Sequence, residues 1–540
     1  MRLKLLCGLC GVLMAANAAR AAPLCSVAAL NALKIPALTV TDARTVAATP
    51  ETPSHCVVLG SVVTRGEGAP EGLAGFSMQL PDAWKQRFLF LGVGGNAGVL
   101  QPSANPVDRA QALKKGYVTI LTDTGHVGDG TSADWVRRAD GELDQAKVTD
   151  FLFRAAHDVA VAGKAFSRAY YAAPILHAYF DGCSTGGRMA LASAIHYPDD
   201  YAGVIAGDPA MDFNLNLARV AIQKALLSRP AGYIPERTLT AIDARITAQC
   251  DTGDGAKDGL VQDPSRCTIR PEDLQCRAGQ AADCLSPEQT ALFKAYVSPL
   301  RDRRGRVIYP GWPIAHLVGA QGPAFYAFGR APPNLANPAA PWGADERAAP
   351  RSWRLATEAL TMWLGYGPAT LIQDTPEADE ANKAVSDEVL ARTRRIMGAG
   401  EARDAAPLQP FIARGGKLIL YHGASDPSIP ATRTTGFYED LLAADGGAKT
   451  QQSVRLFLVP GMHHCGGGAG VDQFDTLSAL EAWVEQGEAP AAILAKTRPD
   501  AAVQREIPLC PYPEQARYSG EGAVTEGANW RCRAPPRRGS

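Results

Sequence analysis

Short apolar runs that end at a glycine or a turn residue recur through the first part of the chain and return after residue 416. Such runs are typical of buried parallel strands. We expect six of them, at residues 87–92, 117–122, 177–181, 202–207, 417–421 and 455–459. Residues 150–170 and 187–196 instead carry apolar side chains at helical spacing. This alternation predicts an α/β fold, a parallel sheet with helices on both faces.

The alternation stops between about residues 210 and 406, a stretch with four cysteines, half of the tryptophans and many prolines. The simplest interpretation is a large insertion that folds as a lid over the carboxyl edge of the sheet, where α/β enzymes bind ligands. An independent domain is the alternative, but the strand pattern resumes directly afterwards. We therefore predict a catalytic domain of residues 22–209 and 407–540, interrupted by a lid at 210–406.

The amino-terminal segment has the features of an export signal. Arg2 and Lys4 precede an apolar stretch, residues 5–18, and a small-x-small cleavage site at 19–21. A membrane anchor is the alternative, but the stretch is short for a span. We expect residues 1–21 to be a bacterial signal peptide, and the mature protein to be periplasmic or secreted and free of the membrane.

The charge and the cysteine content of the chain indicate which partners and which cross-links to expect. The 54 basic and 55 acidic side chains give a net charge of -1, which offers no electrostatic footprint for nucleic acid or membrane. Two of the 12 cysteines lie in the predicted signal peptide and are removed with it, which leaves 10. An even number of cysteines in an oxidising compartment predicts disulfides. Spacing suggests the local pairs Cys25–Cys56, Cys250–Cys267, Cys276–Cys284 and Cys510–Cys532, which leaves Cys183 and Cys465. The sequence does not predict an oligomeric state.

Residues 182–186, Gly-Cys-Ser-Thr-Gly, match G-x-S-x-G, the nucleophile elbow of α/β-hydrolases. The motif is common by chance, but here it follows an expected strand and precedes an expected helix, as the elbow requires. We therefore predict Ser184 as the nucleophile of a serine esterase.

A serine nucleophile needs a base and an acid that orients the base, and in this fold the acid and then the base follow the serine along the chain. Asp426 lies in a turn just past a late strand and is the favoured acid. Asp208 also follows a strand and is its rival, but it closely follows the nucleophile and precedes the insertion.

Three histidines compete for the role of base. His463 and His464 lie in a loop after the last expected strand, and His422 lies near Asp426. If Cys465 bonds Cys183, the residue beside Cys465 faces the residue beside Cys183. That condition selects His464.

An oxyanion hole needs backbone N–H donors. Thr185, directly after the nucleophile, supplies one in this fold. The second should come from the glycine-rich loop at residues 92–98, where Gly95 is favoured and Gly94 is nearly as good. The loop lacks the motifs of a phosphate-binding loop.

Closely spaced carboxylates and glycines occupy residues 251–263, inside the loop that Cys250 and Cys267 would close. Such a loop suits a hard cation with oxygen ligands, although the EF-hand spacing is absent. A solvated turn is the alternative. Repulsion between the carboxylates favours a structural calcium ion.

The motifs at 182–187, 422–426 and 460–468 together resemble those of the tannase/feruloyl esterase family, over nearly all of the chain from Cys25 to Cys532. The resemblance implies an α/β-hydrolase core with a large lid-domain insertion, the five disulfides above, and Ser184, Asp426 and His464 as triad. It also implies calcium bound by Asp251, Asp254, Asp258 and the carbonyls of Ala256 and Leu260.

The resemblance further implies small aromatic ester substrates, such as gallate or ferulate esters. Terephthalate monoesters are a less favoured alternative, because no motif shows which of Arg347, Arg351 and Arg354 would bind a substrate carboxylate. A serine peptidase and a non-catalytic calcium-binding protein remain as alternatives of other kinds. Turnover of peptides with no turnover of esters would favour the peptidase, and wild-type activity on esters no higher than that of Ser184→Ala would favour the calcium-binding protein.

Overall fold

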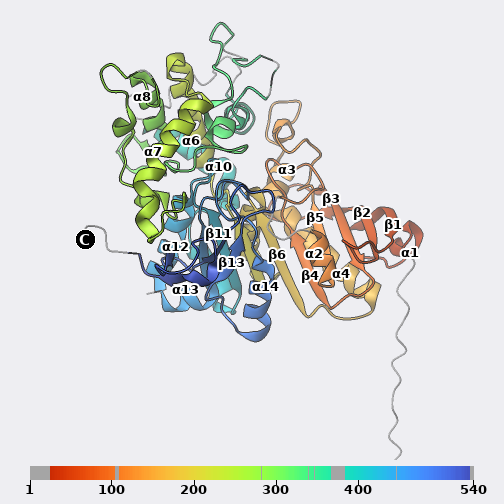
Figure 1. Ribbon diagram of the computed structural model, residues 1–540. Helices are drawn as coiled ribbons and strands as arrows, with labels where there is room; N and C mark the ends of the chain where they lie inside the picture. The colour runs from red at the N-terminus through yellow and green to blue at the C-terminus, as the bar shows by residue number, and fades with distance from the viewer. Residues whose placement is uncertain are drawn as a thin grey trace, which may run out of the picture.

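The computed structural model describes residues 25–103, 109–280, 282–337, 340–343, 345, 347–366, 384–445 and 447–535. The predicted signal peptide, with Cys7 and Cys10, lies outside the described residues. Figure 1 shows a twisted sheet flanked by helices, with the green segments of the insertion gathered at one end of the strands.

The central sheet has nine strands in the described part of the chain, in the order β1-β2-β3-β5-β4-β6-β7-β11-β12. In chain order the strands are β1 (Leu38–Val46), β2 (His55–Thr64), β3 (Gly72–Pro81), β4 (Arg87–Leu91), β5 (Tyr117–Thr122), β6 (His177–Cys183), β7 (Gly203–Gly207), β11 (Lys417–Gly423) and β12 (Val454–Val459). The six strands from β5 to β12 are parallel and correspond to the six expected runs.

Three further strands join the predicted parallel sheet at the amino terminus, so the sheet as a whole is mixed. There β1, β2 and β3 pair antiparallel, and β3 also joins β5 antiparallel. β1 lies at the edge and is largely exposed, so the doubly buried pattern is missing from it. A search for continuous apolar runs therefore misses β1, because an antiparallel strand can keep one face in water.

Helices cover both faces of the parallel strands, as expected. They are α2 (Arg109–Lys114), α4 (Ala155–Tyr171), α5 (Thr185–His196), α12 (Ala431–Asp445) and α14 (Thr476–Glu481), with the short helices α1 (Val27–Asn31), α3 (Gln145–Thr149), α11 (Gln409–Ala413) and α13 (Ala448–Ser453). On one face Lys164 of α4 lies over the ring of Phe88. On the other face the hydroxyl of Tyr117 donates to Glu481 at the end of α14.

Two helix starts differ from the expectation. Helix α5 begins at Thr185, directly after Ser184, rather than at residue 187. The helix expected from residue 150 begins as one π-helical turn, η2 (Asp150–Arg154), and continues as α4. Within this turn Asp150 and Arg154 form a fully buried ion pair of 2.7 Å, which the apolar spacing alone does not reveal.

The described parts of residues 210–406 form a largely helical body (Figure 1, green to cyan). Its elements are α6 (Asn214–Ser228), α7 (Glu236–Cys250), α8 (Pro287–Val297), β8 (Leu300–Asp302), β9 (Val307–Tyr309), η7 (Ala324–Phe328), α9 (Arg351–Glu358), η8 (Ala359–Trp363), β10 (Ala384–Val385) and α10 (Asp387–Met397). Helix α6 starts soon after β7 ends, and the sheet resumes with β11. The division into catalytic domain and lid, with its boundaries, stays a prediction.

The carboxyl-terminal residues form two hairpins, β13 (Ile493–Lys496) with β14 (Glu506–Leu509) and β15 (Gln515–Tyr518) with β16 (Trp530–Arg533). Five disulfides are present. Four join the local pairs that the cysteine spacing suggests, and the fifth joins Cys183 to Cys465, the two cysteines that those pairs leave over. Among the described residues, no helix is both long and apolar enough to cross a membrane.

Candidate active site

Ser184 occupies a sharp turn between β6 and α5. Its backbone has φ 63° and ψ -123°, in a region that non-glycine residues rarely adopt. The turn is tight enough that a Cβ on Gly182 would lie 2.5 Å from the carbonyl carbon of Gly186. Glycine is therefore needed on both sides of the serine, which is the physical reason for the G-x-S-x-G spacing.

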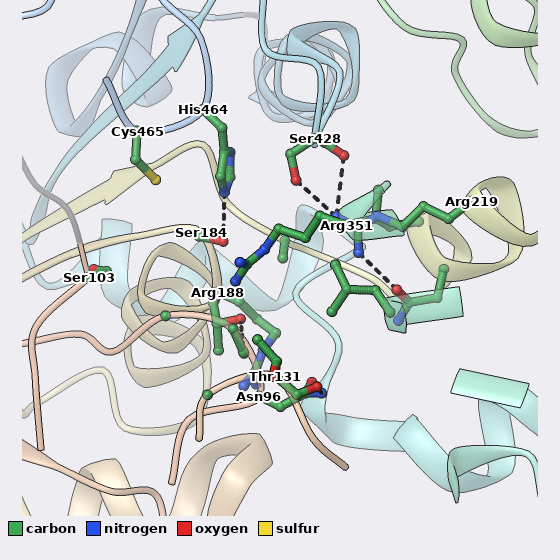
Figure 2. Close-up of a pocket in the computed structure, with 18 of the residues that line it drawn as sticks. Asn96, Ser103, Thr131, Ser184, Arg188, Arg219, Arg351, Ser428, His464 and Cys465 are labelled. Atoms are coloured by element: carbon green, nitrogen blue, oxygen red, sulfur yellow. Dashed lines mark hydrogen bonds between the residues drawn. The ribbon is translucent and has the colours of Figure 1, made fainter. Parts of the chain in front are cut away.

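Three side chains from separate strand ends meet at this turn. The Oγ of Ser184 lies 2.9 Å from Nε2 of His464, and Nδ1 of His464 lies 2.7 Å from Oδ2 of Asp426. Because a carboxylate accepts, Nδ1 carries the imidazole proton and Nε2 is free to accept the serine proton. The geometry is that of a Ser–His–Asp triad. Figure 2 shows His464 and Ser184 facing each other across the pocket.

Asp426 is held as a carboxylate in a fully buried position. Its Oδ1 accepts the N–H groups of Ser428 and Ile429 at 2.7 and 3.0 Å. Burial alone would raise the pKa of Asp426, but His464 and His422 outweigh it and hold the pKa below its usual range. The acid is therefore charged whenever His464 acts as a base.

The other two candidate histidines lie elsewhere. His463 is turned away from Ser184, and its Nε2 donates to the carbonyl of His316 in the insertion at 2.8 Å. His422 is fully buried behind the triad, where its Nε2 donates to the carbonyl of Ile429 at 2.9 Å. The rival acid Asp208 forms no hydrogen bond to the ring of His464, and its oxygens accept backbone N–H groups instead.

The glycine-rich loop after β4 faces the start of α5. Both Gly95 and Thr185 line the same cavity as Ser184. The hydroxyl of Thr185 donates to the carbonyl of Gly95 at 2.6 Å. Gly95 has φ 61°, and a Cβ there would lie 2.1 Å from the carbonyl oxygen of Gly130, so the position requires glycine. Within the described chain the N–H of Gly95 donates to no protein acceptor. An oxyanion donor must be free in this way, because its N–H has to be available to the substrate.

The cavity beside Ser184 has a volume of about 520 Å³, within the range of small-molecule sites. Much of its wall is aromatic. Phe151 and Trp363 lie 5.7 Å apart, Phe213 and Trp363 lie 6.2 Å apart, and Phe325 and Tyr326 add a second aromatic pair. Four of these five rings come from the insertion, so it completes the pocket that the sheet begins.

Three arginines line the pocket (Figure 2). Arg188 donates to the backbone carbonyls of residues 151 and 152, and Arg219 donates to Asn216 and Ser428. Arg351 extends into the pocket on the side of Ser184. Its guanidinium has no hydrogen bond or ion pair with any described residue. Of the other arginines singled out in the sequence, Arg354 pairs with Asp129 at 3.0 Å and Arg347 is not part of the pocket wall.

The acidic loop at 251–263 lies outside the pocket and follows α7. Asp251 accepts the N–H groups of residues 259 and 260 at 3.1 Å. Asp258 forms a buried ion pair of 2.8 Å with Arg505. Oδ2 of Asp254 is buried without a partner, and burial together with Asp258 and Asp251 raises the pKa of Asp254 to about 7.

The donor set of this loop suits a hard cation. The carbonyls of Ala256 and Leu260 accept no hydrogen bond from the described chain, and Asp254 offers a free carboxylate oxygen. Arg505 forms an ion pair with Asp258 and so neutralises that carboxylate of the loop. The remaining oxygens fit the preferences of calcium.

This fold and this triad geometry define a serine hydrolase of the α/β-hydrolase class. The sequence model for tannase and feruloyl esterase matches residues 56–533, and the chain belongs to this family of carboxylic ester hydrolases. It is 31% identical to the mono(2-hydroxyethyl) terephthalate hydrolase of Piscinibacter sakaiensis, over 90% of this chain and 85% of that protein.

A probable feruloyl esterase B-2 of Aspergillus flavus is 30% identical over 77% of this chain and 75% of its own length. Among solved structures, an esterase from Aspergillus oryzae superposes with a TM-score of 0.75 at 24% identity, covering 92% of this chain and 97% of that one. The structural likeness establishes the shared fold.

The sequence named Thr185 and Asp208, but it did not show the contacts that they make or the aromatic side chains of the pocket. The hydroxyl of Thr185, the aromatic wall and the backbone-binding role of Asp208 all depend on contacts across the fold. Of these features, only the position of Asp208 near the triad could have been inferred from the sequence, because Asp208 follows the strand next to the one that carries Ser184.

Proposed function

We propose that this protein hydrolyses esters of aromatic carboxylic acids through an acyl-serine intermediate. The observation that carries the proposal is the continuous chain from Ser184 through His464 to Asp426, with distances of 2.9 and 2.7 Å. The aromatic wall of the adjoining cavity supports an aromatic acyl group, because flat rings stack favourably on aromatic side chains.

In this mechanism Oγ of Ser184 attacks the ester carbonyl while Nε2 of His464 takes its proton. The carbonyl oxygen becomes an oxyanion that the N–H groups of Thr185 and Gly95 would stabilise. The C–O bond of the ester then breaks, and His464 returns the proton to the leaving alcohol. A water molecule, activated by the same imidazole, releases the aromatic acid and restores Ser184.

The direct test compares wild type with Ser184→Ala on methyl gallate, methyl ferulate and mono(2-hydroxyethyl) terephthalate. Loss of turnover in the variant, and an acyl adduct on Ser184 by mass spectrometry of the quenched wild type, are expected. Equal turnover by the two proteins would refute the proposal.

A second candidate, hydrolysis of terephthalate monoesters, is favoured by one observation. Arg351 is a guanidinium that has no partner among the described residues, in a pocket that already holds the nucleophile. A planar guanidinium pairs with a carboxylate through two hydrogen bonds. If the natural acyl group carries a second carboxylate, Arg351→Ala should raise KM for the terephthalate monoester and spare methyl ferulate. An equal effect on both esters would argue for the neutral substrates.

We also propose that the loop at 251–263 binds a structural calcium ion through Asp251, Asp254, Asp258 and the carbonyls of Ala256 and Leu260. The unpartnered oxygen of Asp254 supports this. A bound ion supplies positive charge to three carboxylates in a loop that a disulfide closes. The loop lies apart from the pocket wall, so the ion would stabilise the fold rather than take part in the reaction.

We further propose that the protein is exported. Ten cysteines paired in five disulfides suit an oxidising compartment. Sequencing the amino terminus of the mature protein tests this, because cleavage of residues 1–21 would leave Ala22 as the first residue.

A further inference from the structure

Asp208 is a fully buried carboxylate at the carboxyl end of β7, and the reaction described above gives it no part. Its Oδ1 accepts the N–H of Gly423 at 2.8 Å, and its Oδ2 accepts the N–H of Cys465. Since an N–H can only donate, both oxygens act as acceptors. The ionised carboxylate fits this arrangement, whereas an amide would turn its NH₂ group against one of the two donors.

These contacts join the segments that carry the three triad residues. Cys465 directly follows His464, and Gly423 lies three residues before Asp426. Sγ of Cys183, the neighbour of Ser184, lies 3.6 Å from Oδ2 of Asp208. One side chain therefore contacts the nucleophile, acid and base segments from behind.

The loop that carries His464 needs such an anchor. Cys465 has φ 59°, in the left-handed region that residues with a side chain rarely adopt. The disulfide to Cys183 holds its side chain, and Asp208 holds its backbone N–H. The direction of the His464 side chain follows from this backbone conformation.

His422 supplies the charge that a buried carboxylate needs. Its Nε2 lies 3.3 Å from Oδ2 of Asp426 and 3.7 Å from Oδ1 of Asp208. Its Nδ1 lies 2.8 Å from the hydroxyl of Thr434, which can accept a hydrogen bond. Although burial opposes the charge, Asp208 and Asp426 raise the pKa of His422 above its usual value.

We propose that Asp208 is a positioning residue for the general base, and that it acts as a buried ion pair with protonated His422 behind the triad. The inference rests on the proposed function of Ser184, His464 and Asp426. Besides the two partners, the ionisable groups that face the pair are Asp426, His464, Tyr326 and Tyr421.

The test measures kcat, KM and the pH profile of kcat/KM for methyl ferulate in Asp208→Asn and His422→Gln. The acid limb of this profile reports protonation of the base in the free enzyme. Asp208→Asn should lower kcat by about 10- to 100-fold through misplacement of His464, with little change in KM. Removing a negative charge should also move the acid limb to lower pH.

His422→Gln should move the acid limb in the opposite direction, to higher pH, because it removes a positive charge while its amide can still donate to Ile429. This variant leaves both backbone donors of Asp208 in place, and it tests the ion pair even if Asp208→Asn fails to fold. A limb that stays unchanged or moves to lower pH in His422→Gln would overturn the ion pair.

Asp302→Asn is the matched control. Asp302 is a buried carboxylate that also accepts two backbone N–H groups, but it lies in the β8–β9 hairpin away from the pocket. It should lower thermal stability and leave the pH profile unchanged. If Ser184→Ala abolishes turnover but Asp208→Asn keeps the wild-type kcat and acid limb, the positioning role is wrong and the proposed function stands. If Ser184→Ala stays active, both fail.

Discussion

The hydroxyl of Thr185 donates a hydrogen bond of 2.6 Å to the carbonyl of Gly95, and both residues line the cavity beside Ser184. Gly95 belongs to a loop after β4, whereas Thr185 begins α5. The bond therefore fixes the separation of two residues from different elements, whose N–H groups we propose as the oxyanion donors.

Thr185→Val removes this bond while keeping the shape of the side chain. We expect kcat to fall by about tenfold with KM nearly unchanged, since loss of a whole oxyanion donor costs roughly 100- to 1,000-fold. Thr185→Ser retains the hydroxyl and should keep most of the activity. Steady-state kinetics of the two variants decides, and equal kcat values would show that the hydroxyl does not position Gly95.

Removing the disulfide between Cys183 and Cys465 should cost more activity than stability explains. The bond closes a loop with a separation of 282 residues, for which the chain-entropy model gives an upper figure of about 5 kcal/mol. It also holds the neighbours of Ser184 and His464 together. The double variant Cys183→Ala, Cys465→Ala should lose about 100-fold in kcat/KM at a temperature where circular dichroism shows it folded.

The disulfide Cys510–Cys532 provides the control, because it joins the carboxyl-terminal hairpins away from the pocket. Its removal should lower the melting temperature and leave kcat/KM of the folded protein unchanged. Full activity in the Cys183–Cys465 double variant would contradict the positional role.

Chelation should destabilise the protein if the acidic loop holds calcium. We expect EDTA to lower the melting temperature by several degrees, since about 1 °C corresponds to roughly 1 kcal/mol in a chain of 540 residues. Added calcium should restore it. Asp254→Asn should lose this response, whereas Asp263→Asn, which changes a side chain that caps a turn in the same segment, should keep it.

Asp181 predicts a pH dependence of stability. This residue of β6 is fully buried, neither carboxylate oxygen has a hydrogen-bond partner, and burial raises its pKa to about 8. A carboxyl whose folded pKa lies above its unfolded value of 3.8 destabilises the fold when it ionises. The penalty is absent below about pH 4 and grows as the pH rises towards 8.

Asp181→Asn removes this penalty with little change in shape. The variant and the wild type should unfold at similar urea concentrations at about pH 4, and the variant should be more stable at about pH 8.5. Each unit of pKa shift corresponds to about 1.4 kcal/mol, so a gain of a few kcal/mol is the upper expectation. Parallel loss of stability in both proteins between these pH values would show that Asp181 does not titrate there.

Much of this protein follows from local sequence. The six parallel strands, the elbow at Ser184 and the four local disulfides depend on the spacing of residues near one another in the chain, and steric and hydrophobic rules act at that range. The antiparallel strand β1 was missed because an exposed edge strand has no continuous apolar run. Strands β2 and β3 are mostly buried, so this reason does not apply to them.

Contacts between distant segments decided the rest. Asp208 and Asp426 both follow strands, and position in the chain favoured Asp426 as the acid. Only the fold shows that the carboxylate of Asp426 reaches His464 and that the carboxylate of Asp208 reaches the N–H of Cys465. Arg347, Arg351 and Arg354 could not be told apart along the chain, yet the packing of α9 turns Arg351 into the pocket and pairs Arg354 with Asp129. The direction in which each of these side chains points is set by packing between the sheet and the insertion. These segments are far apart in the chain, so no short stretch of sequence contains that information.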